Sequence, residues 1–346
     1  PYLSWEIEEK KNYGIDLGLF DNRIDLQVDY FNNKRKSILL QRNTVSNVTG
    51  FQQMPWQNFG IVKNHGVDAS LTLNQKIGQV NLSARGNFTF ARNEIIEYDQ
   101  VPQVYPWLEK RGTRLNSNKL YIAEGLYTYD DFIINGEGLN RTYELKPGVV
   151  SGLSSGVRPG DIKYKDQNGD GIIDAEDEIA IGRSNYPELV YGLNLNAEWK
   201  GFDITFFFQG AALADFYYNG YLAFPYIEGR GGALLEHHIG NTWTPENPKA
   251  EFPRLYYGGN ANNQLFSSFW MRNGSYLRLK NVEIGYDFKK LLLSKVSEIQ
   301  GLRLYFSGSN LLTWSQIKYF DPELRSTDGS AYPQMKTFVF GANITF

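Results

Sequence analysis

The 346-residue sequence contains no cysteine and only three histidines. Without thiols it can form neither a disulfide framework nor a thiolate metal site. It also lacks any run of about 18 apolar residues, the length that a membrane-spanning helix needs. Basic residues are not in excess, because 35 Lys and Arg face 38 Asp and Glu. A surface that binds nucleic acid is normally basic, so nucleic acid is not expected as a partner.

Aromatic residues and glycine, by contrast, are abundant. The sequence has 23 Tyr, 22 Phe, 7 Trp and 34 Gly. Its mean hydropathy of −0.42 would suit a soluble protein. A membrane β-barrel, however, carries its apolar residues at alternate positions, so its average stays polar. Abundant aromatics suit lipid-facing rows and interfacial girdles, and glycines suit bends in strands.

The last eleven residues, 336–346, show this alternation most clearly. Phe338, Phe340, Ala342, Ile344 and Phe346 fall on one face of an extended chain, and mainly polar or small residues fall on the other. A tilted transmembrane strand needs about 9–11 residues. The segment therefore predicts a membrane strand with a lipid-facing row and a polar inner row.

Eight further segments alternate in the same way, which gives nine predicted strands in all. They are residues 13–20, 24–31, 66–74, 79–91, 189–199, 202–210, 276–288 and 302–312. Short turns and long connections join them in alternation, the asymmetry expected of a transmembrane barrel. A change of parity between Leu279 and Val282 predicts a β-bulge. The connector at 289–297 is predicted to be partly helical.

These patterns predict an all-β, transmembrane antiparallel β-barrel. Nine strands cannot close around a lumen, and unpaired edge amides are costly in lipid. Plugged barrels of the largest single-chain class have about 22 strands. The chain begins at Pro1 without an initiator Met or signal segment, so we expect residues 1–346 to be the C-terminal part of a larger plugged barrel. A soluble β-sandwich also alternates, but its strands usually have about five or six residues.

The long connection 94–187, expected to be extracellular, contains an acidic loop at residues 166–177. Calcium loops place oxygen ligands at positions 1, 3, 5, 7, 9 and 12, with glycine at position 6. The matching residues are Asp166, Asn168, Asp170, Ile172, Asp174 and Asp177, with Gly171 at the turn. Position 12 is Asp instead of the longer Glu. The loop predicts a structural Ca²⁺ site, and the alternative is an ion-free turn rich in Asp and Asn.

Aromatic residues in the long connections are candidate ligand contacts, because sugar rings stack on aromatic faces. The candidates are Trp56, Phe216, Tyr217, Tyr218, Tyr221, Tyr226 and Trp243. The alternative is that they form an interfacial girdle or pack one loop against another.

Catalysis is not expected. The neighbouring carboxylates of Asp130 and Asp131 do not establish the spacing that glycoside hydrolysis requires. The sequence has no nucleophile elbow and no zinc-protease helix motif. We expect His237 and His238 to lie on an exposed loop.

Several short motifs together carry a family resemblance. They are residues 5–6 (Trp-Glu), 14–18, 29–31, 64–68, 159–171 (from Pro-Gly-Asp to the acidic loop), 181–188, 191–193, 243–248, 252–255, 273–281 and 309–312. In this order they resemble the SusC/RagA-like TonB-dependent transporters of Bacteroidetes outer membranes, and the resemblance runs from end to end.

The resemblance implies an outer-membrane barrel closed by an upstream plug, with a TonB box that couples it to TonB. It also implies a SusD-like surface lipoprotein as a lid, and import of oligosaccharides or peptides without a chemical reaction. Two alternatives stay open: a siderophore- or cobalamin-type TonB-dependent receptor, and a structural or adhesive outer-membrane β-domain.

Overall fold

The computed structural model describes residues 3–153, 156–226, 233–288, 299–324 and 328–346. The connector at 289–297, predicted to be partly helical, lies outside these ranges. None of the described helices is long and apolar enough to cross a membrane.

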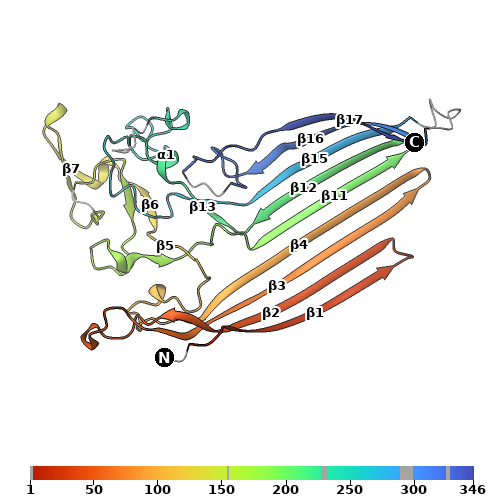
Figure 1. Cartoon of the computed structure of the whole chain (residues 1–346). Coiled ribbons are helices and arrows are strands. Elements are labelled where there is room, and N and C mark those ends of the chain that lie inside the picture. The colour runs from red at the N-terminus through yellow and green to blue at the C-terminus, as the bar shows by residue number, and fades with distance from the viewer. Residues whose placement is uncertain (1–2, 154–155, 227–232, 289–298, 325–327) are drawn as a thin grey trace.

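One curved antiparallel sheet dominates the molecule (Figure 1). Its nine strands are neighbours in the order β1-β2-β3-β4-β11-β12-β15-β16-β17, which confirms the predicted number. They are β1 (Ile7–Leu19), β2 (Ile24–Gln41), β3 (Trp56–Ile77), β4 (Val80–Glu97), β11 (Leu189–Trp199), β12 (Phe202–Ala212), β15 (Tyr276–Asp287), β16 (Gly301–Ser315) and β17 (Thr337–Thr345). Each strand follows its neighbour in the chain, so the sheet is a meander.

Several strands extend beyond their predicted ends. β11 has the predicted bounds, but β3 begins ten residues before the predicted 66. The extensions lie on the side of the long connections, where β2 continues through Asn32 to Lys36 with polar residues on both faces. Because neither face is apolar in this part of β2, no alternation marks it. In β3 a register shift between Ile61 and Val62 interrupts the alternation.

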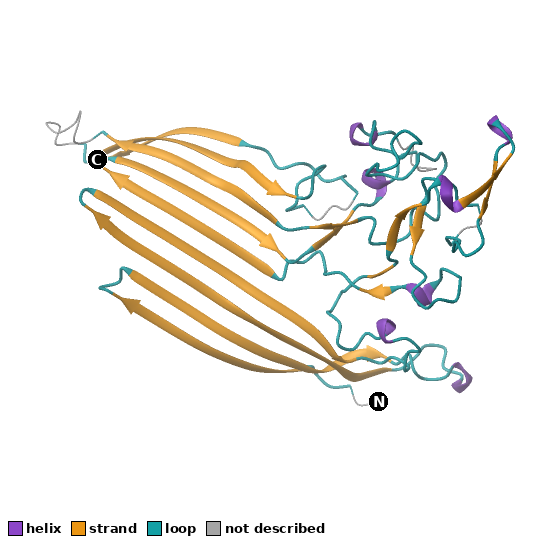
Figure 2. Cartoon of the chain, turned by 180° about the vertical axis from the view of Figure 1, so that it is seen from behind, coloured by secondary structure: helices purple, strands orange, loops and turns teal. Residues whose placement is uncertain are grey.

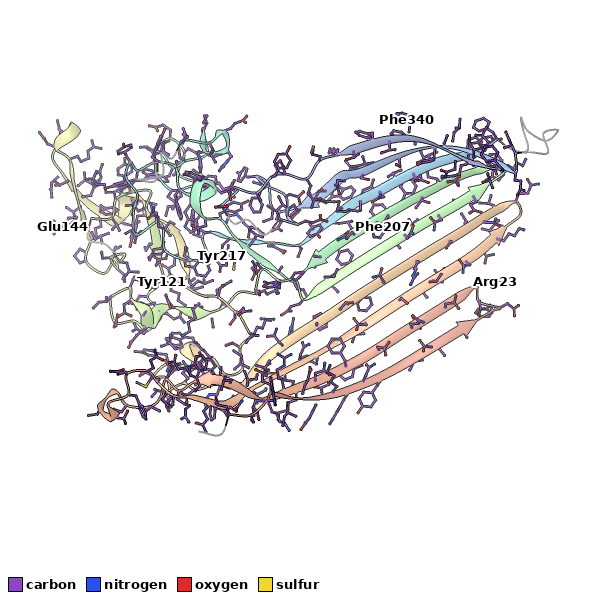
Figure 3. The ribbon with its side chains drawn as sticks, in the orientation of Figure 1. Arg23, Tyr121, Glu144, Phe207, Tyr217 and Phe340 are labelled. Carbon is purple, nitrogen blue, oxygen red and sulfur yellow. The ribbon has the colours of Figure 1, made fainter. Side chains whose placement is uncertain are left out.

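The strand register places apolar side chains in continuous rows across the sheet. Leu17 pairs with Leu26, which pairs with Leu71, and Leu193 pairs with Phe208 further along the same row. On β17 Phe340 is 83% exposed and points away from the sheet (Figure 3). An exposed apolar face of this extent requires a nonaqueous partner. The face thus has the properties of a lipid-facing wall.

The opposite face of the sheet carries ion pairs. Arg303 on β16 donates from Nε to Asp203 on β12 at 2.9 Å and from Nη2 to Glu283 on β15 at 2.6 Å. The three side chains come from three adjacent strands, so they join these strands on the polar face.

The predicted bulge is present on β15. The pairing of β15 with β16 shifts between Leu279 and Asn281, and the pairing with β12 shifts at the same place. The extra residue, Lys280, lies beside Arg278 in an ion cluster. Arg278 is 2% exposed and contacts Asp321 at 2.5 Å and Glu323 at 3.2 Å. The cluster fastens the connection after β16 to the polar face of the sheet.

Tight turns join the strands at one end of the sheet (Figure 2). Lys200 and Gly201, between β11 and β12, have φ values of 50° and 95°. Two consecutive residues with positive φ form the turn that matches the twist of a β-hairpin. This explains the glycine at the second position.

The long connections meet at the other end of the sheet and form a second unit, which we call the loop body. It consists of the described parts of residues 98–188, 213–275 and 316–336. Its short elements are β5 (Lys119–Leu120), β6 (Ala123–Leu126), β7 (Phe132–Asn135), β8 (Thr142–Leu145), β9 (Ile162–Tyr164), β10 (Ile179–Ala180), β13 (Asp215–Tyr217), β14 (Met271–Asn273) and α1 (Gly220–Ala223). Single 3₁₀ turns lie at Asn47–Thr49, Pro106–Leu108, Tyr129–Asp131, Gly138–Asn140, Ala175–Asp177 and Glu236–His238.

The hydrophobic core of the described residues lies in the loop body. Its buried members are Leu120, Tyr121, Ile162, Tyr164, Ile173, Phe216, Tyr217, Tyr218, Ala223, Phe252, Trp270 and Ile317. They come from all three connections. The connections therefore hold one another in place and do not act as independent loops.

We expect Arg278→Met to release the connection after β16 from the sheet. Removing one partner of a buried ion pair leaves the other charge uncompensated, at a cost of about 3–5 kcal/mol. Hydrogen exchange in residues 316–324 and 328–336 should accelerate strongly while β15 and β16 stay protected. Arg111→Met is the matched control, because Arg111 forms an exposed pair with Glu109. Equal exchange in both variants would contradict the assignment.

Candidate functional site: a cavity lined by amides and aromatic rings

The loop body contains a half-open cavity of about 550 Å³. Its lining residues are Asn116, Asn118, Ser184, Asn185, Tyr186, Asp215, Tyr217, Tyr218, Asn219, Phe224, Gln264, Leu265, Phe266 and Trp270. They come from the connection before β11 and from the connection after β12. We call this the amide–aromatic cavity.

Aromatic rings form one part of its wall. The rings of Tyr217 and Phe266 are stacked, with centroids 4.0 Å apart and planes inclined by 29°. Phe224 meets Trp270 edge to face at 5.1 Å. Trp270 is buried, whereas Phe266 is exposed. The rings thus present an apolar surface anchored in the core of the loop body, with Tyr217 at the end of the short strand β13 (Figure 3).

Amide side chains supply most of the polar lining. The Asn118 amide donates to the Arg183 carbonyl at 3.3 Å, and the Asn219 side chain accepts from the Gly220 amide at the start of α1. The side chains of Asn116 and Gln264 form no hydrogen bond to any residue that the structure describes. Each offers one acceptor and a two-hydrogen donor to a ligand.

Asp215 is the one carboxylate among the described residues of the lining, and it is largely buried. It accepts a hydrogen bond from the Arg183 amide, and its Oδ1 lies 3.7 Å from Nη1 of the Arg183 guanidinium. Its charge is therefore balanced within the protein. Burial, with a smaller contribution from Asp215, raises the pKa of Tyr217 well above its usual value. The Tyr217 hydroxyl consequently stays protonated.

A second cavity of about 530 Å³ adjoins the first on the polar face of β2, β3 and β4. The two share Asn116, Ser184 and Tyr186. The second cavity is charged, since its lining includes Glu8, Arg35, Glu97, Arg114 and Glu188. Glu188, just before β11, also pairs with Arg92 on β4 at 2.7 Å.

Asp161 links the two long connections from a fully buried position. Its carboxylate forms an ion pair with Arg254 at 2.8 Å and accepts from the side-chain amides of Asn260 and Asn263 at 2.9 Å each. The preceding Gly160 has a φ of 89°, and a Cβ there would lie 2.4 Å from the Trp243 ring. These contacts give the Gly-Asp pair of the 159–171 motif a structural role.

The predicted aromatic contacts are distributed over different sites. All three of Phe216, Tyr217 and Tyr218 are buried in the core, and Tyr217 and Tyr218 also line the amide–aromatic cavity. Trp243 packs on Gly160 and Tyr129, and Tyr221 is half-buried on α1. Tyr226 lies near Tyr257, and Trp56 is 52% exposed at the start of β3. As ligand contacts all seven stay predictions, and two of them share a cavity.

Sequence reasoning missed the polar half of the cavity. Asn116, Asn118 and Gln264 belong to no motif or periodic pattern, and more than a hundred residues separate Asn116 from Gln264. Asn185 and Tyr186 lie in the motif 181–188, which was a usable signal. Their shared position becomes visible only after the two connections have packed together.

The acidic loop has the oxygen-rich composition that Ca²⁺ prefers. Asp166 accepts from the backbone amides of Gly169 and Gly171 at 2.6 and 2.7 Å, and Asp170 accepts from Ile172 at 2.8 Å. Buried Asp177 accepts from the amides of Gln167 and Asp174. Within the described residues no three acidic or histidine side chains are grouped as metal ligands. These oxygen donors suit Ca²⁺. The Ca²⁺ site itself stays a prediction.

The expectation that both histidines are exposed is wrong for His238. His238 is fully buried, and its Nε2 lies 3.1 Å from the Leu222 carbonyl oxygen. The His237 ring stacks on Tyr319 with centroids 4.2 Å apart. Burial, and then the charge of His237, lower the pKa of His238 to about 4. The pair is part of the core that joins the connections, a role with no marker in the sequence.

Comparison with known proteins identifies the family of the chain. A family model described as "TonB dependent receptor-like, beta-barrel" matches residues 1–177. The chain belongs to this family. Its outer-membrane location, predicted from the motifs, is thereby confirmed.

Named relatives extend the match along this barrel chain. TonB-dependent receptor P26 of Formosa agariphila is 28% identical over 100% of the chain and 35% of its own length. TonB-dependent receptor SusC of Bacteroides thetaiotaomicron is 25% identical over 99% of the chain and 32% of its own length. A solved structure of the RagAB peptide transporter has a TM-score of 0.69 and 26% identity, covering 99% of the chain and 36% of its own. The chain thus spans about a third of the length of these relatives, and the resemblance to SusC/RagA-like proteins is confirmed.

We expect the loop body of the barrel to lose stability as the pH falls from 6.5 to about 4. In that interval the unfolded state binds a proton at His238 and the folded state does not, so acid favours local unfolding. Each unit of pKa difference is worth about 1.4 kcal/mol, so the loss is at most roughly 3 kcal/mol. Hydrogen exchange in residues 219–226 and 233–253 measures it. His238→Gln should reduce the pH dependence, and the remainder would come from groups such as Glu251, whose pKa is lowered, despite its burial, by the hydrogen bond from Tyr319 and by Lys318. His65→Gln on β3 should retain the full dependence.

Proposed function

We propose that the chain is the C-terminal barrel portion of a TonB-dependent outer-membrane importer of oligosaccharides or peptides. The amide–aromatic cavity is the observation that supports this. Side-chain amides pair with hydroxyl groups or peptide units, and aromatic faces stack on sugar rings or apolar side chains. Both ligand classes combine such groups, and both are too large for simple pores.

The proposed orientation follows the asymmetry of the connections. Outer-membrane barrels have short periplasmic turns and long external loops. The loop body, which contains all of the predicted connection 94–187 except the end of β4 and the undescribed residues, would therefore face the outside, with the tight turns in the periplasm. β1 and β17 are the outer strands of the described sheet. Their outer edges need partners in lipid, which strands of a barrel of about 22 would supply around an upstream plug.

We infer two protein partners for the complete importer. One is TonB, which would act through the N-terminal part of the protein. The other is a SusD-like surface lipoprotein above the loop body. The match to a structure titled RagAB peptide transporter supports a paired assembly of this type. The membrane lipid would contact the apolar face of the sheet.

The cavity favours this function over the alternatives. A structural or adhesive domain has no need for a pocket with free amides. Ferric siderophores are commonly anionic, and no Lys or Arg is found among the lining residues that the structure describes. We infer transport without catalysis, since stacked rings and amides bind ligands but supply no general acid or nucleophile.

We also propose a structural Ca²⁺ ion in the acidic loop, held by Asp166, Asn168, Asp170, the Ile172 carbonyl, Asp174 and Asp177. The Trp107 indole donates to the Glu176 carbonyl at 2.8 Å, so the loop is attached to an earlier part of the same connection. An ion there would stiffen the loop body without taking part in transport.

Growth experiments test the proposed importer. A deletion strain should lose growth on one defined glycan or peptide source but not under iron limitation. In the complemented strain, Phe266→Ala removes one ring of the exposed stack, which is worth about 0.5–1.5 kcal/mol, and should weaken binding of that nutrient about three- to tenfold. Tyr257→Ala, at a position 87% exposed and outside the cavity lining, is the control. A defect confined to iron limitation would instead indicate a siderophore receptor.

Calorimetry tests the calcium site. Adding Ca²⁺ to the full-length protein should release heat that EGTA abolishes, and should raise the melting temperature. Asp170→Asn should weaken binding at least about tenfold because it removes one charged oxygen ligand. Asp130→Asn, at an exposed carboxylate outside the loop, should bind normally. Absence of calcium-dependent heat in the unaltered protein would rule the site out.

A further inference from the structure

We propose that the amide–aromatic cavity selects an uncharged segment of the imported polymer and disfavours carboxylated, sulfated or cationic segments. This inference rests on the proposed import function and narrows the ligand class. It depends on the charge balance of the lining, on the free amides and on the contrast with the neighbouring cavity.

The described part of the lining carries no unpaired charge. Among the fourteen described lining residues Asp215 is the only acid, and none is Lys, Arg or His. Asp215 is already paired with Arg183, whose own guanidinium does not belong to the lining. A charged ligand group would lose its water without meeting a free opposite charge, and such desolvation is costly.

The free polar groups of the cavity suit neutral partners. Asn116 comes from the connection before β11, and Gln264 comes from the connection after β12. Each carries both a donor and an acceptor. Amides that approach from two connections pair equally with hydroxyls and with peptide groups. The Tyr217–Phe266 stack adds an apolar surface, which favours a neutral segment further.

The adjoining cavity shows that neutrality is local. Beyond the shared residues Asn116, Ser184 and Tyr186, its lining includes three glutamates and two arginines. A charged end of a ligand could therefore lie near the sheet while its uncharged segment occupies the amide–aromatic cavity. The inference concerns the segment in the first cavity and not the net charge of the whole ligand.

Competitive capture by the full-length importer in detergent provides the test. One probe mixture contains capped octapeptides of Gly, Ser, Asn and Phe. It also contains charged versions of these peptides, in which Glu or Lys residues are placed along the whole length. The other contains neutral hexoses linked as hexamers, together with hexamers of uronates. We expect the neutral members of one mixture to be retained at least about tenfold more than the charged members, because no free counter-charge lines the cavity.

Two variants show whether the cavity is responsible. Gln264→Lys should shift retention about tenfold toward the Glu peptides or uronates, since it supplies the missing counter-charge. Gln53→Lys adds the same charge at an exposed position in the connection between β2 and β3 and should leave the preference unchanged. Equal shifts in both variants would attribute selection to general surface charge and overturn the proposal.

The failures are distinguishable. If the unaltered protein retains charged members as well as or better than neutral ones, charge selection is wrong and import still stands. If it retains neither mixture, both the proposed import of these polymers and the inference built on it fail.

Discussion

The pairing of backbone amides across nine adjacent strands is the constraint on which the rest of this structure depends. Inside a bilayer no water is present to form a hydrogen bond with an unpaired backbone amide, so a strand is stable only between two other strands. The meander satisfies this requirement locally, since each strand pairs with the next one along the sheet. Hydrophobic side chains then need not be buried inside the protein. They face outward along the rows that include Leu17, Leu71 and Leu193.

Because the sheet directs its apolar side chains outward, the hydrophobic core of the described residues is formed by the loop body. Its three connections are rich in irregular backbone, which would be unstable if each had to hold its own shape. Buried polar groups compensate for this. Asp161 gathers Arg254, Asn260 and Asn263 around one carboxylate, and Trp270 donates from its indole to the Asn263 carbonyl. The core is thus assembled from segments that are distant in sequence, in contrast to the sheet.

This difference explains what could be predicted. Period-two alternation is a local signal, and it identified all nine strands and the bulge at Lys280. It failed at the extended end of β2, where residues 32–36 are polar on both faces, and at that of β3, where a register shift between Ile61 and Val62 interrupts the alternation. In the loop body no period exists, so the burial of His238 and the cavity shared by Asn116 and Gln264 left no trace in the sequence. Aromatic composition located Tyr217 and Tyr218, but it could not separate residues that line the cavity from the core residue Phe216.

In the loop body, the residues that stabilise the packing differ from the residues that would determine which ligand binds. Gly160 leaves no room for a side chain beside the Trp243 ring, and the buried Asp161 carboxylate pairs with Arg254. Asn116, Asn185 and Gln264 are exposed, and the side chains of Asn116 and Gln264 bond to none of the described residues. After a gene duplication, substitutions at these few exposed amides would therefore change the imported ligand and leave the buried contacts of the loop body unchanged.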